Sequence, residues 1–368
     1  MKSEVGQFEL LGTDPSSQAR RGRLHTAHGT VETPVFMPVG TQATVKAMSP
    51  REMHEMDCEI LLGNTYHLND RPGPDLIQQL GGLHKFMGWD RAILTDSGGY
   101  QVFSLGGMNK ITNEGVSFKS HSDGSEHFIG PRESMEIQRK LGSDIAMVFD
   151  ECPPYPCEKD YACQAVRRTL DWAAICREAP RAEGQLYFGI AQGSIYPELR
   201  EECAKALVEM DFDGYAIGGV SVGEPDELIL RGVDDTVGHL PEGRPRYLMG
   251  VGEMAQMVES VARGVDMFDC VMPTRQARNG TVSTRRGRYP VKAALYKEDT
   301  RPLEEGCTCY ACTNFTRAYV RHLLNVGEIL GLRLITMHNL HCLSLYTSPS
   351  PRDCGPDLVC RLLLEKWG

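Results

Sequence analysis

The chain has 368 residues, of which 41% are hydrophobic, and carries a formal net charge of -10 at pH 7. This composition supports a folded protein with a sizeable core and excludes a disordered chain. It contains no run of about 18 apolar residues, which argues against a membrane span. The first 25 residues hold no apolar segment of the kind found in secretory signals. We therefore expect a cytoplasmic protein without a membrane partner, and the acidic balance argues against nucleic-acid binding over the whole surface.

Short apolar runs recur along the chain, and amphipathic segments such as 158–179 and 197–210 lie between them. Continuous apolar runs that alternate with helical periodicity are typical of buried parallel strands. Eight such units favour the α/β class and a closed (β/α)8 barrel over an open doubly wound sheet. No GxGxxG follows the first run, so a dinucleotide-binding fold has no support. The runs are VFMPVG (35–40), EILLGN (59–64), AILTDSGG (92–99), IAMVFDE (145–151), LYFGIAQG (186–193), YAIGG (215–219), RYLMGVG (246–252) and MFDCVMPT (267–274).

Polar residues stand near the ends of most of these runs. In a barrel, the carboxyl ends of all strands meet at one rim, where active sites lie. Turns are often polar for no functional reason, which is the simpler alternative. However, charged residues are seldom buried beside apolar runs unless they are paired or functional. The sequence therefore predicts a site built from rim residues that include Asn64, Asp96, Asp150, Gln192, Gly218, Gly219, Gly250 and Asp269.

The segment 104–130 interrupts the third unit of this pattern. Within it, ITNEGVSFKS (111–120) is typical of a hairpin whose turn lies at Asn113–Gly115. We expect this excursion on the rim side of the barrel.

Three cysteines in a CxCxxC pattern, Cys307, Cys309 and Cys312, precede His338 by 25 residues. Three thiolates and one imidazole form a closed tetrahedral zinc site, which would be structural because no coordination position stays open. The other ten of the 13 cysteines are scattered, which favours reduced thiols over a disulfide framework. Free cysteines with an ordinary histidine, or an iron–sulfur cluster, are the alternatives.

A basic segment runs from 275 to 292 without an acidic residue. It is either a solvated loop or a local phosphate-binding surface. Its cations are Arg275, Arg278, Arg285, Arg286, Arg288 and Lys292.

Long ordered motifs over roughly residues 7–341 resemble the tRNA-guanine transglycosylases, also called queuine tRNA-ribosyltransferases. They are TPVFMPVGTQATVKAM, LLGNTYHL, LTDSGGYQVFSL, FDECPPYP, FGIAQGS, GYAIGGVSVGE, RYLMGVG, DMFDCVMPTRQARNGTV and CTCYACTNFTRAY…HNL. The resemblance implies an irregular (β/α)8 barrel with a zinc-binding insertion, which agrees with the reading above. It implies one catalytic domain over 1–368 with a zinc-binding subdomain at about 275–341.

The same resemblance implies an activity. Family members exchange guanine at the wobble position of tRNAs with a GUN anticodon for the 7-deazaguanine preQ1, in queuosine biosynthesis. The exchange is a double displacement through a covalent enzyme–RNA intermediate. Asp269 matches the nucleophile and Asp96 the general acid/base. A carboxylate suits an oxocarbenium-like centre, and a second carboxyl must move protons to and from the bases. The expected partners are the tRNA anticodon loop, preQ1, guanine and a second copy of the chain.

Other residues match positions that hold the substrates. The residues that match those reading the edge of the base are Ser97, Asp150, Gln192 and Gly219, and Tyr100 and Met249 match the pair that stacks on its ring. Glu224 matches a carboxylate behind the Gly219–Val220 peptide. Arg275 and Arg278 match contacts to the anticodon loop. Cys152 and Val222 match the bacterial members, and the bulk of Val222 is expected to favour preQ1 over the larger queuine.

The chain departs from the family pattern after about His341. Pro349, Pro351 and Pro356 forbid the continuous helix that the resemblance implies there. The stretch LSLYTSPSPRD resembles a translated sequencing adapter, so residues from about 342 to 368 are interpreted as an atypical, non-native tail.

Two other functions use the same residues. A (β/α)8 glycoside hydrolase could employ both aspartates, but would need neither the zinc cluster nor the basic segment. A non-catalytic tRNA-binding subunit would be expected to lack Asp96 and Asp269, and both are present.

Overall fold

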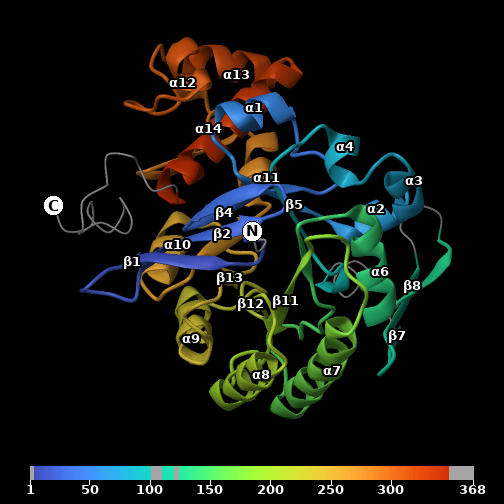
Figure 1. The fold of residues 1–368 in the computed structure, drawn as a ribbon. Coiled ribbons are helices and arrows are strands. Elements are labelled where there is room, and N and C mark those ends of the chain that lie inside the picture. The colour runs from blue at the N-terminus through green and yellow to red at the C-terminus, as the bar shows by residue number, and fades with distance from the viewer. Residues whose placement is uncertain (1–3, 101–109, 120–123, 348–368) are drawn as a thin grey trace.

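The computed structural model describes residues 4–100, 110–119 and 124–347. Its centre is a closed barrel of eight parallel strands (Figure 1). Each of the eight predicted apolar runs supplies one strand, which confirms the expected fold class. The strands follow one another around the barrel in the order β10, β11, β12, β13, β14, β4, β5, β6. Their bounds are β4 (Val35–Gly40), β5 (Ile60–Gly63), β6 (Ala92–Thr95), β10 (Ile145–Met147), β11 (Leu186–Ala191), β12 (Gly214–Ile217), β13 (Arg246–Leu248) and β14 (Met267–Cys270).

The strands read as unbroken apolar runs because both of their faces are covered. Strands β4, β5, β6, β11 and β12 are buried at every position. Most strands end earlier than the predicted runs, because the polar residues at the ends of the runs form the loops of the rim. The strands thereby deliver those polar side chains to one end of the barrel.

Helices surround the later strands. They are α6 (Pro131–Leu141), α7 (Lys159–Arg177), α8 (Pro197–Glu209), α9 (Asp226–Val237) and α10 (Met254–Val261), and the two predicted helical segments correspond to α7 and α8. Helix α6 illustrates how the sequence sets its limits: Pro131 occupies its first turn, and Gly142 ends it in the left-handed conformation. Shorter helices follow β4, β5 and β14: α1 (Pro50–Glu55), α2 (Thr65–Asp70), α3 (Pro74–Gln79), α4 (Leu83–Met87) and α11 (Met272–Arg278).

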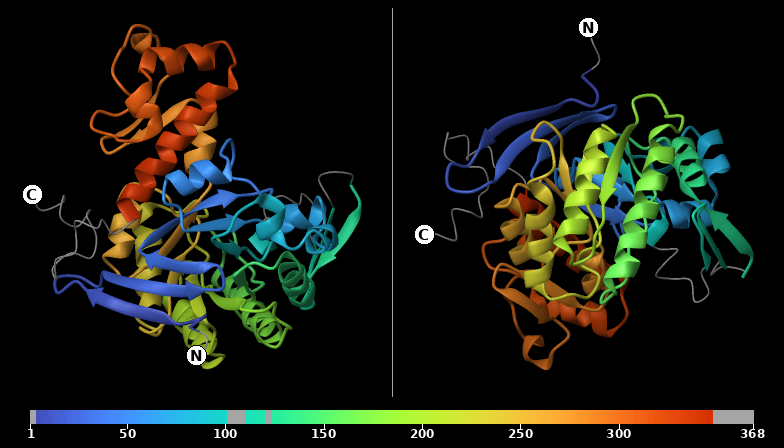
Figure 2. Two further views of the ribbon diagram at one scale, coloured as in Figure 1. Left: turned by 45° about the horizontal axis from the view of Figure 1, so that its top comes forward. Right: turned by 90° about the horizontal axis from the view of Figure 1, so that it is seen from below.

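An antiparallel sheet that the sequence pattern did not predict lies at the amino-terminal end of the barrel strands (Figure 2). It contains β1 (Phe8–Thr13), β2 (Arg20–Thr26) and β3 (Gly29–Thr33). Arg20 pairs with Asp266, which directly precedes β14, at 2.5 Å. The ring of His28 lies 2.8 Å from Asp144, which directly precedes β10. The sheet therefore covers the end of the barrel opposite the rim.

The excursion after β6 forms a second antiparallel sheet of β7 (Lys110–Ile111), β8 (Val116–Lys119) and β9 (Glu126–Ile129). The predicted hairpin is confirmed, because β7 pairs with β8 and Thr112 donates from its backbone to the carbonyl of Gly115 at 2.9 Å. The third strand was not predicted.

The carboxyl-terminal part contains β15 (Thr281–Thr284), β16 (Gly287–Pro290), the 3-10 helix η1 (Ala294–Tyr296), α12 (Tyr310–Asn314), α13 (Arg317–Asn325) and α14 (Ile329–Thr347). Figures 1 and 2 show α12 and α13 standing away from the barrel, with α14 leading back to it. This part has a small core of its own, which includes Val282, Leu303, Val320 and Ile335. Helix α14 continues past His341 as far as Thr347. The interpretation of the tail from 348 onward falls outside the described residues.

No helix in the described ranges combines the length and the apolar character needed to cross a membrane.

Candidate active site and metal centre

Asp96 follows strand β6 directly and is buried at the rim. Its Oδ1 accepts hydrogen bonds from the backbone of Thr65 (2.8 Å) and Gly98 (3.2 Å), and its Oδ2 accepts one from Asn64 Nδ2 (2.6 Å). Burial raises the pKa of Asp96 to about 7, and the negative charge of Asp269 adds to this, while the backbone hydrogen bonds oppose it. The carboxyl group can therefore hold or release a proton near neutral pH, as a general acid/base must.

Asp269 lies in strand β14, which is separated from β6 by β4 and β5. Its Oδ1 accepts hydrogen bonds from the hydroxyl of Tyr247 at 2.6 Å and from the backbone of Gly250 at 2.8 Å. Burial raises the pKa of Asp269, and these two hydrogen bonds counteract the rise. Asp96 and Asp269 therefore lie on strands of the same rim, and the charge of Asp269 is one of the smaller causes that raise the pKa of Asp96.

A polar wall links Asp150 to neighbouring strands. Ser97 Oγ donates to Asp150 Oδ1 at 3.3 Å, and Gln192 Nε2 donates to Oδ2 at 2.7 Å. Burial raises the pKa of Asp150 to about 6. The Oε1 atom of Gln192 is buried and has no hydrogen-bond partner within the described part of the chain. A buried acceptor of this kind suits a ligand that brings an N–H group.

Gly219 sits against the same wall in the left-handed conformation, with φ +63°, and a Cβ at this position would collide with Gln192 Oε1. Both requirements favour glycine. The fully buried guanidinium of Arg200, in α8, donates to the carbonyls of Gly218 at 3.1 Å and Gly219 at 3.0 Å. Arg200 therefore fixes the backbone that carries Gly219.

Glu224 is a buried carboxylate at the end of the loop after β12. Its Oε1 accepts from the backbone of Ser221 at 2.5 Å, and its Oε2 accepts from Val222 at 2.9 Å. We expected it behind the Gly219–Val220 peptide. The turn places it one and two peptides further along, because Ser221 adopts a positive φ of 59° that aims both N–H groups at the carboxylate.

Tyr100 and Met249, the expected stacking pair, follow two different strands of the barrel. Tyr100 comes after β6 and is 49% exposed, while Met249 follows β13 and packs partly against the barrel core. Partial burial raises the pKa of Tyr100. Cys152 also raises this pKa, and the positive charge of Arg275 lowers it. Tyr100 and Met249 therefore both follow the carboxyl ends of barrel strands, at the rim.

The basic segment is divided between α11 and the β15–β16 hairpin. Arg275 and Arg278 lie on α11, the helix that follows Asp269, and both are exposed. Arg285 pairs with Glu304 at 3.7 Å, and Arg288 pairs with Glu253. The two arginines on α11 are thus the members of this segment whose position next to the site best suits a phosphate backbone.

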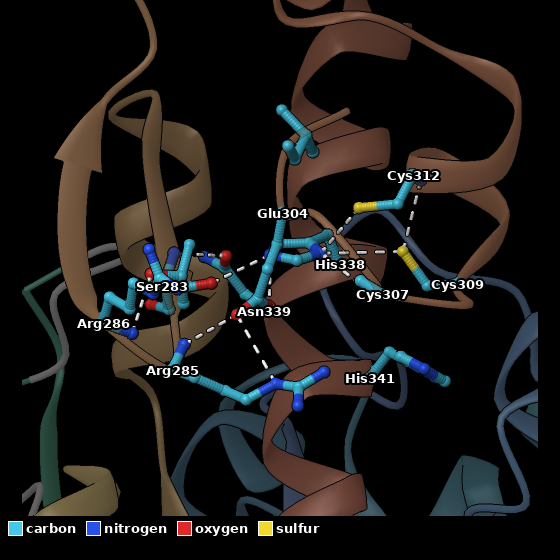
Figure 3. Close-up of polar contacts among 12 residues, drawn as sticks. Ser283, Arg285, Arg286, Glu304, Cys307, Cys309, Cys312, His338, Asn339 and His341 are labelled. Carbon is cyan, nitrogen blue, oxygen red and sulfur yellow. Dashed lines mark hydrogen bonds and ion pairs between the residues drawn. The ribbon is translucent and has the colours of Figure 1, made fainter. Parts of the chain in front are cut away.

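The predicted metal ligands come together in the carboxyl-terminal part (Figure 3). Cys307, Cys309, Cys312 and His338 are buried, and their candidate ligand atoms lie within 4.8 Å of one another. The Nδ1 of His338 is 3.6 Å from the sulfur atoms of Cys307 and Cys309 and 3.3 Å from that of Cys312. This cluster could hold a metal ion, and three thiols with one imidazole supply a complete tetrahedral donor set.

A second cluster, of His28, His84 and Asp144, lies at the opposite end of the barrel. The two imidazole rings stack with centroids 3.6 Å apart and planes 16° apart. A metal ion lies close to the plane of each ring that binds it, and two stacked parallel rings do not share such a position. Both oxygens of Asp144 already accept hydrogen bonds from the rings and from the backbone of His28 and Ile93. We interpret this cluster as a structural link between the β2–β3 turn and the barrel.

Sequence reasoning missed three residues that support the site. Tyr247 donates a hydrogen bond to Asp269, and Arg200 donates one to the carbonyl of Gly219. Asn339 accepts from the backbone of Ser283 at 2.9 Å and donates to the carbonyls of Pro273 and Thr281. A signal existed for Arg200, because it shares the buried face of α8 with Cys203, Ala204 and Leu207 at helical spacing.

Comparison with known proteins agrees with this arrangement. The family model described as queuine tRNA-ribosyltransferase matches residues 14–348. The queuine tRNA-ribosyltransferase of Pelotomaculum thermopropionicum is 60% identical over 334 residues, which cover 91% of this chain and 90% of that protein. Those of Desulforamulus reducens and Moorella thermoacetica are 59% and 58% identical, again over 91% of this chain and 90% of each relative. The chain therefore belongs to the queuine tRNA-ribosyltransferase family.

Proposed function

We propose that this chain is a tRNA-guanine transglycosylase of queuosine biosynthesis. It exchanges guanine at the wobble position of tRNAs with a GUN anticodon for preQ1. The observation that carries the proposal is that two carboxyl groups, Asp96 directly after β6 and Asp269 in β14, lie at the same rim of one closed barrel, each held by hydrogen bonds from the backbone. Exchange at a glycosidic carbon requires a nucleophile and a proton carrier that act on the same nucleoside.

In the first step, Asp269 attacks the ribose C1′ and the bond to guanine breaks. The departing base takes up a proton from Asp96, whose pKa of about 7 leaves a large protonated fraction at neutral pH. In the second step, the incoming base loses a proton to Asp96 and displaces the carboxylate. Two displacements at C1′ return the original configuration, as in retaining glycosidases.

The polar wall of Asp150, Gln192 and Gly219 offers groups that complement the amide edge of a purine-like base. Asp150 accepts from N–H groups, and Gln192 Oε1 is a buried acceptor without a partner among the described residues. Ser97 orients Asp150. Tyr100 and Met249 would supply the stacking faces. The target nucleotide must leave its stack to reach this wall, so we expect it to be flipped.

Glu224 and Val222 bear on the choice of the incoming base. The Glu224 carboxylate accepts a hydrogen bond from the Val222 backbone and so holds the loop that carries this valine, which matches the position expected beside the incoming base. Its volume favours the small aminomethyl group of preQ1 over the cyclopentenediol of queuine. Cys152 agrees with the same assignment, since bacterial members resemble this chain there.

The expected partners are the tRNA, a zinc ion and a second copy of the chain. Arg275 and Arg278 would contact the phosphates of the anticodon loop, and a tRNA substrate favours the cytoplasm. The Cys307 cluster would bind one structural zinc ion, because its donors match that metal and leave no open position. The family resemblance implies a homodimer, and exposed apolar side chains of the carboxyl-terminal part, namely Leu295, Tyr310, Val326 and Ile329, are candidates for the contact between the two copies.

The test is the exchange of labelled guanine into an unmodified tRNA with a GUN anticodon. The wild-type protein should incorporate the label and form a covalent RNA adduct. Asp269→Asn should form neither, and Asp96→Asn should slow the exchange. Release of guanine without incorporation would indicate a hydrolase instead. Binding of tRNA without either reaction, by protein with a normal thermal transition, would indicate a non-catalytic subunit.

A further inference from the structure

The two oxygens of the Asp269 carboxylate have different surroundings. Oδ1 accepts both hydrogen bonds of the group, from Tyr247 at 2.6 Å and from the Gly250 backbone at 2.8 Å. Oδ2 accepts none from the residues that the structure describes. One oxygen is thus held by two donors while the other stays available.

Tyr247 reaches this oxygen from the neighbouring strand. Strands β13 and β14 pair in parallel with Tyr247 opposite Met267, so the tyrosine side chain extends toward the rim where Asp269 lies. The side chain of Tyr247 is completely buried. Burial, together with the charge of Asp269, keeps the pKa of Tyr247 well above its ordinary value. The hydroxyl therefore remains a hydrogen-bond donor over the whole working pH range.

We propose that Tyr247 is a positioning residue for the exchange: with the Gly250 N–H it fixes Oδ1 of Asp269, which makes Oδ2 the attacking oxygen, and it stabilises the carboxylate that leaves in the second step. This inference rests on the proposed function. In the first step, a lone pair of Oδ2 forms the bond to C1′, and the electron pair of the C1′–guanine bond leaves with guanine, which is protonated by Asp96. In the second step, the nitrogen of the incoming base bonds to C1′, its proton passes to Asp96, and the C1′–Oδ2 electron pair returns to Asp269.

The two donors act unequally on the two states of Asp269. In the adduct, Oδ1 is the carbonyl oxygen of a neutral ester, whereas in the free enzyme it carries half of a negative charge. Hydrogen bonds to charged acceptors are stronger than those to neutral ones. Tyr247 therefore favours the free carboxylate over the ester, and its removal should slow the breakdown of the adduct more than its formation.

The experiment compares Tyr247→Phe with Tyr187→Phe in the full-length protein. Tyr187 is a matched control because it is also a completely buried strand tyrosine, and its hydroxyl donates to the carbonyl of Pro180 at 2.8 Å, away from the rim. The adduct is formed with unmodified tRNA, chased with excess guanine, and followed on denaturing gels.

Tyr247→Phe should slow breakdown roughly 10- to 100-fold and raise the steady-state fraction of adduct. The acid limb of the rate profile should move to higher pH, because the hydrogen bond from Tyr247 lowers the pKa of Asp269. Tyr187→Phe should change none of these quantities.

A breakdown rate of Tyr247→Phe equal to that of the wild type, in protein with an unchanged thermal transition, would overturn the inference. Absence of adduct and of exchange in the wild type would instead refute the proposed function, so the two failures are distinguishable. If Tyr247→Phe does not fold, 3-fluorotyrosine placed at position 247 decides the question. Its more acidic hydroxyl is a stronger donor, so the adduct should break down faster than in the wild type, and an unchanged rate would overturn the inference.

Discussion

The Nε2 atom of His338 lies 2.8 Å from the carbonyl oxygen of Ser283 (Figure 3). Strand β15 thus orients the imidazole of a residue on helix α14, and its Nδ1 faces the three thiols. Outer hydrogen bonds of this kind fix the tautomer and the direction of a metal-binding histidine. The relationship links the metal cluster to the hairpin that follows α11, and so to the region of the candidate RNA contacts.

Removal of the metal should unfold the carboxyl-terminal part while the barrel remains folded. Structural sites of this donor type contribute on the order of 10 kcal/mol to local folding near pH 7. Chelation, or Cys312→Ser, should therefore make residues 281–328 sensitive to limited proteolysis and abolish stoichiometric zinc. Cys163→Ser, a half-buried free thiol on α7, is the control. Equal protease resistance of the metal-free and metal-loaded proteins would contradict this prediction.

Asn339 should matter for stability far more than its size suggests. It is fully buried and makes three hydrogen bonds to the backbone of β15 and α11. Asn339→Ala leaves those groups without partners, so we expect a loss of about 2–4 kcal/mol in the free energy of unfolding. Denaturant titration measures this loss, and the exposed Asn325→Ala should stay within about 0.5 kcal/mol of the wild type.

The rate of guanine release should depend on the protonation of Asp96. Its pKa is raised to about 7, chiefly by burial. The acid form is required in the first step, so single-turnover release should be fastest below pH 7 and decline as the pH rises through this value. Asp96→Asn should be slow and should lose this alkaline decline. A wild-type profile that is flat between pH 6 and 9 would remove Asp96 from the role of general acid.

Arg275 should contribute to tRNA affinity through charge. It is exposed on α11, so Arg275→Ala is not expected to change the stability of the fold. Loss of one phosphate contact should reduce the slope of log affinity against log salt by about 0.7 to 0.9. Filter binding at several salt concentrations measures the slope. Arg51→Ala, which removes an exposed arginine paired with Glu55 on α1, should leave the slope unchanged.

Asp144 should stabilise the fold in a pH-dependent manner. Burial by itself would raise its pKa, but hydrogen bonds and charge from His84, with further hydrogen bonds from His28 and the Ile93 backbone, lower it below the ordinary value of 3.8. The folded state therefore favours the ionised form, and this contribution is present above pH 3.8 and lost as the pH falls through the folded pKa. Asp144→Asn should cost roughly 3–5 kcal/mol at pH 7. The difference from the wild type, measured by denaturant titration, should narrow below pH 4. A difference that stays constant to pH 3 would contradict the assignment.

The eight barrel strands could be predicted because buried parallel strands leave a local record of unbroken apolar runs. The metal ligands could be predicted for a similar reason, since the CxCxxC spacing is itself a local feature. The β1–β3 sheet was missed because its buried positions carry few apolar residues: β2 alternates regularly, but the side of it that is buried consists of Arg20, Gly22, Leu24 and Thr26. Its stability comes from contacts to the barrel such as Arg20 with Asp266, which are 246 residues apart in sequence.

The sequence by itself determined the barrel, the residue types of the rim and the cysteine cluster, because hydrophobic periodicity and short spacings are properties of neighbouring residues. Only the tertiary structure decided which oxygen of Asp269 is held, which backbone Arg200 supports and which peptides Glu224 binds. Those relationships depend on strand register and on turn conformation, and they join side chains that chain distance keeps apart. Burial then gives them their chemical effect, since the shifted pKa values of Asp96 and Asp150 arise from removing the carboxyl groups from water.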